Sequence, residues 1–383
     1  MSRVSLTILF FLSFLFVQCE DSGSDLNQEQ YELQKIGERK IFIDSTTNLV
    51  STFMTYFQEG KNNYLVFENR YENAIQFYDL STGRLAFKTS FEEKGDNSLG
   101  GDGVGGFFIH SLDSIFVIGR ESSRISLTNK QGDILNSVRV TPDGDPYWDL
   151  IGVNKVPLVY HDEKLYVIGL GDFPIFSEPA NGQPLEIEVD FFKDDSKVIF
   201  AFPNIYEGFY GPYHTHPCRT FNGRQLVYSF PISPDLYVFD PLTRETEKHS
   251  ISSPYVKVER FKPLNVVNQE TMRKATIEQG IFMEVVYDAY RGLYYRFVLH
   301  PTDLVDPASG FVRSGVAHKP FSIQIIDKDF NKLGETYFPP MELHQKDFFV
   351  GPEGLYISEN HPNRTDLNES ELVFSIFRPI EEE

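Results

Sequence analysis

The stretch FYDLSTGRLAFKTSF, residues 77–91, decides the fold that the sequence predicts. Two short runs rich in aromatic and aliphatic residues flank a polar turn, which Asp79 can start and Gly83 can complete. Because β-branched and aromatic residues favour strands, the stretch predicts two antiparallel strands joined by a tight turn.

The same sequence pattern of strand, turn and strand recurs along the chain. The turns start near residues 79, 128, 179, 240 and 327. A spacing of about 50 residues fits the four antiparallel strands of one β-propeller blade. Such a blade needs neighbours on both sides to bury its faces, and the 35 Phe and 20 Tyr would pack between blades.

Five turns predict five blades, and residues 347–380 supply three strands of a sixth. A spare strand at 39–44 (RKIFID) would complete that last blade and close the ring, leaving no exposed sheet edge. The sequence therefore predicts an all-β, six-bladed propeller over residues 35–383, with seven blades as the alternative. The long gap after residue 240 predicts an insertion at about 263–320, with a short helix and a loop broken by Gly and Pro.

The first residues are typical of a secretory signal. A cationic start precedes an apolar run at 4–17, which as a helix would span only about 21 Å and is too short to cross a membrane. We therefore expect residues 1–18 to be a signal peptide. Cys19 at the cut resembles the lipobox of bacterial lipoproteins, in which that thiol carries a lipid, although Gln18 and Phe16 depart from its usual residues. An ordinary signal peptide is the alternative.

Residues 19–34 are polar and acidic, and we expect a flexible tether there. Glu20 and Asp21 resemble the export cue that follows the cysteine in lipoproteins of Bacteroidetes; simple solvation of the linker is the alternative. From residue 19 onward the chain resembles the six-bladed, TolB-like propeller lipoproteins of Bacteroidetes, a family of undefined function. That resemblance implies an outer-membrane lipoprotein of the cell envelope, attached through a lipid anchor, with exposure at the cell surface left open.

Charge and cysteine content exclude some classes of protein. The formal net charge of −20 repels phosphate backbones, so nucleic acid is not an expected partner. Only two cysteines are present, and lipidation of Cys19 would leave Cys218 without a partner. The fold must then depend on its hydrophobic core, with Cys218 as a small buried residue.

The segment YEGFYGPYHTHPC, residues 206–218, is the first candidate site. On a strand, His214 and His216 would point to one face and could chelate zinc, with His110 or an acidic side chain across the ring as a third ligand. The aromatic residues Tyr210 and Tyr213 suit a general ligand-binding surface near the channel mouth equally well. Purely structural roles are the remaining interpretation.

The segment DGDPYWD, residues 143–149, is the second candidate. Asp143, Asp145 and Asp149 could bind calcium, although the pattern of an EF-hand is incomplete. Trp148 could stack on a sugar or a cationic group, and a solvated turn is the alternative. No cofactor is predicted outright, and calcium and zinc remain alternatives.

No catalytic motif supports an enzyme directly. G-x-S-x-G, H-E-x-x-H and a Rossmann fingerprint are absent from the sequence, and the Gly-rich stretch 95–106 lacks the Lys-Ser/Thr of a phosphate loop. The sequence thus favours a non-catalytic binding or scaffolding module for a glycan, peptide or protein. The alternatives are a metal-dependent lactonase or lyase with its site at the channel mouth, and a structural subunit of an outer-membrane complex.

Overall fold

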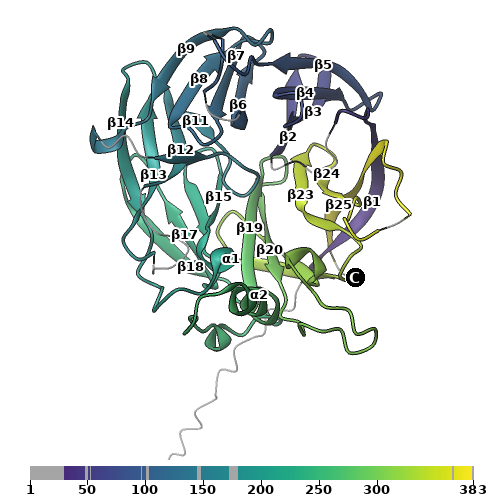
Figure 1. Ribbon diagram of the computed structural model, residues 1–383. Helices are drawn as coiled ribbons and strands as arrows, with labels where there is room; N and C mark the ends of the chain where they lie inside the picture. Colours follow the sequence, from purple (N-terminus) through teal and green to yellow (C-terminus); the bar gives the residue numbers. More distant parts are fainter. Residues whose placement is uncertain are drawn as a thin grey trace, which may run out of the picture.

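A computed structural model describes residues 30–47, 51, 53–95, 97–100, 103–144, 148–171, 180–364 and 366–381. Over these residues the strands form six antiparallel sheets around a central axis, which is a six-bladed β-propeller (Figure 1). The predicted all-β class and the six blades are confirmed. The predicted signal peptide and Cys19 lie outside the described residues.

Each blade runs from an innermost strand at the axis to an outermost strand. Blade one comprises β2 (Met54–Glu59), β3 (Asn62–Asn69), β4 (Ala74–Asp79) and β5 (Arg84–Ser90). Blade two comprises β6 (Val104–Ser111), β7 (Ser114–Gly119), β8 (Arg124–Thr128) and β9 (Ile134–Arg139). Blade three comprises β10 (Asp149–Ile151), β11 (Val159–His161), β12 (Lys164–Leu170), β13 (Pro184–Asp190) and β14 (Asp195–Ala201).

The second half of the ring repeats this plan. Blade four comprises β15 (Cys218–Phe221), β16 (Leu226–Ser229), β17 (Asp235–Phe239) and β18 (Thr246–Ser250). Blade five comprises β19 (Ile281–Asp288), β20 (Leu293–Leu299), β21 (Phe321–Ile326) and β22 (Lys332–Phe338). Blade six comprises β23 (His344–Gly351), β24 (Gly354–Ser358), β25 (Glu371–Glu381) and β1 (Tyr31–Phe42).

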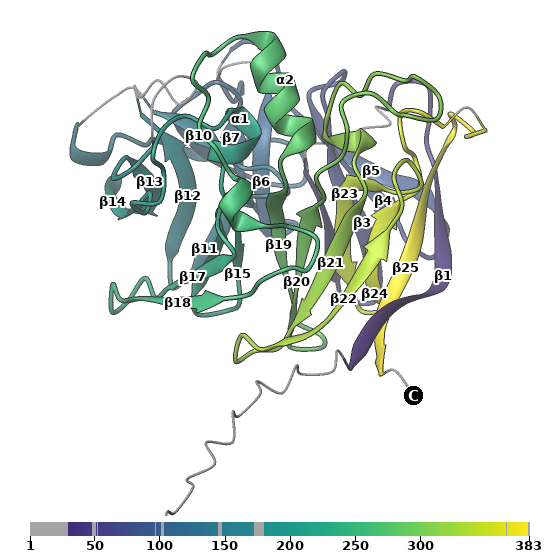
Figure 2. The same ribbon diagram turned by 90° about the horizontal axis from the view of Figure 1, so that it is seen from below.

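Few helices accompany these strands. They are η1 (Pro142–Gly144), α1 (Pro212–Thr215), η2 (Val258–Arg260), α2 (Gln269–Glu278) and η3 (Val316–His318). Figure 2 shows α1 and α2 on the same face of the propeller. None of the described helices is long and apolar enough to span a membrane.

The stretch that predicted the fold forms the outer hairpin of blade one. The Asp79 side chain accepts hydrogen bonds from the backbone N–H groups of Ser81 (2.8 Å) and Thr82 (2.9 Å). Gly83 has a φ of 67°, and a Cβ there would lie 2.5 Å from the carbonyl oxygen of Lys40. Only glycine therefore completes this turn without strain.

The N-terminal strand closes the ring, as the sequence predicted. β1 pairs antiparallel with β25 from Tyr31 opposite Glu381 to Phe42 opposite Glu371, and the two strands lie side by side in Figure 1. The strand begins at Tyr31, not Arg39, so residues 31–34 belong to the sheet and not to the tether predicted at 19–34.

The predicted insertion at 263–320 is wrong in its middle. Residues 281–299 form β19 and β20, the two inner strands of blade five. Two separate segments flank them: residues 251–280, which carry α2, and residues 300–320. The turn between the strands uses the same Asp and Gly chemistry as blade one, because Asp288 accepts from the N–H of Tyr290 at 3.0 Å and Gly292 has a φ of 66°.

Aromatic side chains pack between neighbouring blades. Ring centroids lie 4.6 Å apart for Phe53 and Phe107, which join blades one and two, and 4.7 Å apart for Phe297 and Phe348, which join blades five and six. Such pairs stabilise the ring beyond their buried area. They explain why the chain carries so many Phe and Tyr residues.

Candidate functional site

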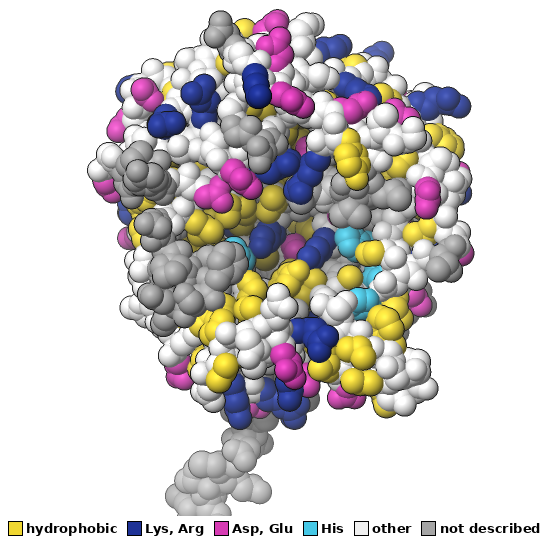
Figure 3. Space-filling view, in the orientation of Figure 1, with side chains coloured by type: hydrophobic (Ala, Val, Ile, Leu, Met, Phe, Trp, Pro, Cys, Tyr) yellow, Lys and Arg dark blue, Asp and Glu magenta, His cyan; other side chains and the backbone are white. Residues whose placement is uncertain are grey.

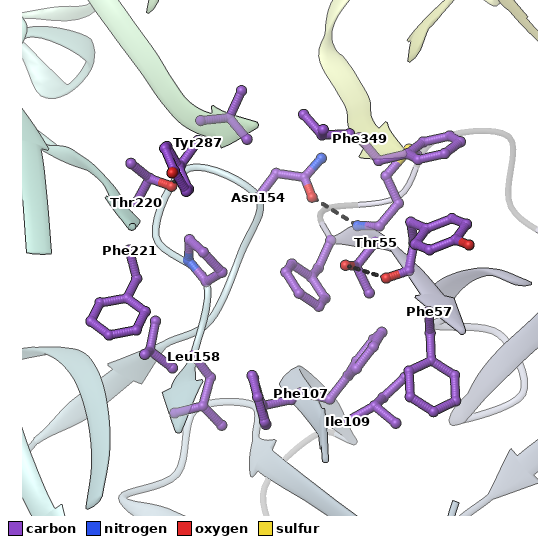
Figure 4. A pocket seen from close by; sticks show the side chains of 18 of the residues that line it. Thr55, Phe57, Phe107, Ile109, Asn154, Leu158, Thr220, Phe221, Tyr287 and Phe349 are labelled. Carbon is purple, nitrogen blue, oxygen red and sulfur yellow. Dashed lines mark hydrogen bonds between the residues drawn. The ribbon is translucent and has the colours of Figure 1, made fainter. Parts of the chain in front are cut away.

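Two cavities lie along the propeller axis. The first, of about 450 Å³, is enclosed by the innermost strands of all six blades. Aromatic and aliphatic residues line it, and Figure 4 labels Phe57, Phe107, Phe221, Tyr287 and Phe349 among them. This cavity is the central channel, and its lining is mainly apolar.

The second cavity, of about 370 Å³, lies next to α1, and we call it the axial pocket. Its lining residues are Ser51, Val153, Asn154, Lys155, Tyr213, His216, Cys218, Met283, Glu284, Lys346 and Asp347. Figure 3 shows basic, acidic and histidine side chains together in a hollow near the centre of this face. Charged groups therefore gather here, in contrast to the channel.

A loop of blade three separates the two cavities. Its innermost strand is interrupted: β10 and β11 both pair with β12, and residues 152–158 leave the sheet between them. Asn154 in this loop lines both cavities. Its Oδ1 accepts from the N–H of Met54 at 2.8 Å, and its Nδ2 donates to the carbonyl oxygen of Lys346 at 3.1 Å (Figure 4 draws the bond to Met54).

Blade four holds the same loop from the other side. Arg219 donates from its backbone N–H to the carbonyl oxygen of Lys155 (2.6 Å) and from its guanidinium to that of Pro157 (2.7 Å). The guanidinium also contacts Glu186 at 3.0 Å, and both side chains are fully buried. Tyr228 donates to the other oxygen of Glu186 at 2.9 Å. This buried network fixes the position of Lys155 at the pocket.

Two buried acidic residues reach the axial pocket from β-bulges. The strand register shifts between Phe282 and Val285 in β19, and again between His344 and Phe348 in β23. A bulge re-aims side chains, and these two place Glu284 and Asp347 at the pocket.

The two carboxyl groups differ in their partners. Glu284 is 4% exposed, and its Oε2 has no hydrogen-bond partner among the described residues. Burial raises the pKa of Glu284, against the smaller opposing effects of Lys346 and Lys155. Asp347 is 1% exposed, and one of its oxygens lies 2.8 Å from Nδ1 of His344. Burial raises its pKa too, although His344 opposes the rise.

Two half-buried lysines complete the charged part of the pocket. Lys155 comes from the blade-three loop and Lys346 from β23, which lies opposite in the ring. The Nζ of Lys346 lies 5.0 Å from the ring centroid of Tyr213, a cation–π contact. Within the described part of the chain, neither ammonium group forms an ion pair with a carboxylate.

The structure divides the first predicted site. Tyr213 and His216 line the axial pocket, whereas Tyr210 and His214 are buried. The expected strand is wrong, because Pro212–Thr215 form α1 with Pro212 at the start of the helix, a position that proline favours. Burial lowers the pKa of both histidines to about 3, so both imidazoles are neutral near pH 7.

The second predicted site lies away from the pocket lining. Trp148 is 7% exposed and its indole packs over Gly169 and Gly171 in the core of blades two and three. Asp143 and Asp149 are exposed, and Asp145 lies outside the described residues. His110 is exposed on β6, with its ring 5.5 Å from that of Tyr160. Over the described ranges, no three His, Cys, Asp or Glu side chains are arranged to hold a metal ion.

Sequence reasoning missed the charged residues of the pocket: Lys155, Glu284, Lys346 and Asp347. Each lies within or next to a stretch of apolar residues. Glu284 lies inside IFMEVVY, and Lys346 and Asp347 lie inside HQKDFFV. A charge inside a run that is otherwise buried is the signal that could have singled them out.

Comparisons with known proteins agree with this fold. A crystal structure of a DUF4221 family member from Bacteroides vulgatus matches with a TM-score of 0.79 and 25% identity, covering 93% of this chain and 100% of that chain. A Bacteroides fragilis protein, described as a suspected exported protein, matches with a TM-score of 0.52 and 11% identity, covering 94% of this chain and 98% of that chain, which shows the shared fold alone. No curated protein matches the chain. The family described as "Domain of unknown function (DUF4221)" matches residues 30–337, and the chain belongs to this family.

Proposed function

We propose that this propeller is a non-catalytic binding module and that the axial pocket is its ligand site. The observation that carries the proposal is the unpartnered Oε2 of the buried Glu284 at the wall of a 370 Å³ cavity. A buried polar atom without a hydrogen bond costs about 1–3 kcal/mol. A ligand that bonds to this carboxyl group offsets that cost, so the pocket gains from being filled.

A ligand screen tests this proposal. Oligosaccharides, short peptides, organic acids and amines are each added to the protein, and thermal unfolding and NMR spectra report binding. We expect at least one compound to raise the unfolding temperature, and Tyr213→Ala, which removes one wall of the pocket, to abolish the rise. Tyr337→Ala is the matched control, because Tyr337 is exposed on β22. No hit in any of the four classes would contradict the proposal.

We further propose that the module is exported and anchored through a lipid on Cys19 in the outer membrane. The support is the order of the first residues: a cationic start, an apolar run, and a cysteine followed by two acidic residues. Cys19→Ser should move the protein from the membrane fraction to the soluble fraction. Unchanged fractionation would refute the anchor.

A further inference from the structure

We infer that the axial pocket takes a small organic anion, with its acidic head between Lys155 and Lys346 and an apolar body beside them. This inference rests on the proposed binding function and names the class of ligand. The hydrogen bond from Asn154 to the carbonyl oxygen of Lys346, at 3.1 Å, joins the two lysine-bearing segments. Two residues from opposite blades therefore meet at one end of the axis.

The ammonium groups of Lys155 and Lys346 lack a direct ion-pair contact among the described residues. The chain carries a net charge of −20, and ion pairs are common on its surface, yet neither of these ammonium groups is paired within the described ranges. Partial burial weakens the hydration of both groups, which strengthens their attraction for an anion. A cationic ligand would instead meet two like charges in a half-buried site.

The acidic residues of the pocket do not cancel this preference. Asp347 lies 2.8 Å from His344, and burial raises the pKa of Asp347, which favours its neutral form. Burial favours the protonated form of Glu284, which can donate a hydrogen bond to an anionic oxygen. The acidic head of a ligand would thus meet two ammonium groups, and the carboxyl group of Glu284 can donate to it when protonated.

The remaining wall suits an apolar body. Val153, Met283 and Cys218 line the pocket together with the ring of Tyr213. The volume of 370 Å³ lies within the range of about 300–1,000 Å³ that is usual for small-molecule sites. Carboxylates and phosphonates share the required head-group chemistry, and the experiment below distinguishes them.

The test is a calorimetric titration of the whole protein with four matched probes. They are 3-phenylpropanoate, 2-phenylethylphosphonate, 3-phenylpropanamide and 3-phenylpropylamine. We expect at least one anion to bind and the amide and the amine to bind at least tenfold more weakly. If only one anion binds, that result identifies the head group.

Variants locate the binding. Lys155→Met and Lys346→Met should each weaken anion binding at least tenfold, and Lys346→Arg, which keeps the charge, should restore most of it. Lys328→Met is the control, since Lys328 is exposed in the turn between β21 and β22. Circular dichroism and unfolding temperature show that each variant is folded.

The outcomes separate the two proposals. If the amide or amine binds as tightly as the anions, or if both lysine variants keep full affinity, the anion class is overturned and the binding function stands. The same holds if all four probes fail while a compound of the wider screen that is not an organic acid binds and is lost in Tyr213→Ala; an organic acid that does so supports the anion class. If both the probes and the wider screen fail, both proposals fall.

Discussion

The side chain of Asn154 accepts a hydrogen bond from the backbone N–H of Met54 at 2.8 Å, across 100 positions of sequence. This bond ties blade three to blade one at the axis and places one amide between the central channel and the axial pocket. The loop of residues 152–158 thus divides the propeller along its axis, and Asn154 is the residue of that loop that lines both cavities.

Asn154→Ala should join the two cavities and leave the N–H of Met54 without its partner. The expected loss is about 1–3 kcal/mol in the free energy of unfolding, measured by urea denaturation. Asn136→Ala, on the exposed face of β9, should stay within about 0.5 kcal/mol of the parent. Equal effects of the two substitutions would show that Asn154 has no special role at the axis.

Arg219→Met should be among the most destabilising single changes. It leaves the fully buried Glu186 without its cation, and breaking such a pair costs about 3–5 kcal/mol. The double variant Arg219→Met with Glu186→Gln should recover part of the loss, since no unpaired charge remains. Guanidinium denaturation measures both, and a single variant as stable as the parent would contradict the network described here.

Gly106→Ala should destabilise the contact between blades two and three. A Cβ at Gly106 would lie 2.1 Å from the carbonyl oxygen of Gly152, at the start of the loop that carries Asn154. Overpacking of this kind costs about 1–3 kcal/mol. Gly315→Ala is the control, because the space around Gly315 is open; a similar loss in both variants would refute the argument.

Because Lys319 is buried, we expect the free energy of unfolding to rise with pH. Its ammonium group donates to the carbonyl oxygens of Thr276 (2.8 Å), Ile277 (2.6 Å) and Gln279 (2.7 Å) at the end of α2, and burial lowers its pKa to about 7. The ordinary lysine value of 10.5 applies in the unfolded chain. Between these two values the native state binds fewer protons than the unfolded state, so the free energy of unfolding increases with pH.

The comparison with Lys319→Met isolates this effect, because His214 and His300, whose pKa values burial and Lys319 lower, are neutral above pH 7. The stability of the parent relative to the variant should increase from pH 7 to pH 10, by at most about 1.4 kcal/mol per pH unit. Urea denaturation at several pH values measures the difference. A constant difference, or one that shrinks, would contradict the lowered pKa.

Local turn chemistry made the fold predictable. The carboxyl group of Asp79 and the left-handed backbone of Gly83 act within a few residues, so the sequence shows them directly. Turns that look alike in the sequence can join different pairs of strands. In blade three the predicted turn near 179 lies between β12 and β13. The other predicted turns join the two outermost strands of their blades, which in blade three are β13 and β14. In blade five the turn at Asp288 was missed, and two core strands were assigned to an insertion.

The pocket was harder to predict because its residues converge from distant segments. Tyr213 and His216 stood out within one aromatic, His-rich stretch. Lys155 and Lys346 meet only because residues 152–158 leave the sheet and reach across the axis. No local sequence pattern shows that the loop of residues 152–158 reaches across the axis. The bulge that directs Glu284 to the pocket depends on the pairing of β19 with β20, which comes later in the chain.

The pairing of β1 with β25 sets the order in which the molecule can be completed. Residues 31–42 leave the ribosome before every blade, yet their hydrogen-bonding partners at 371–381 are among the last residues made. β1 therefore lacks its partner strand β25 until all the other strands have been synthesised. A product cut short before residue 371 would keep two open sheet edges, which favour aggregation, so translation must run nearly to its end before the ring can form.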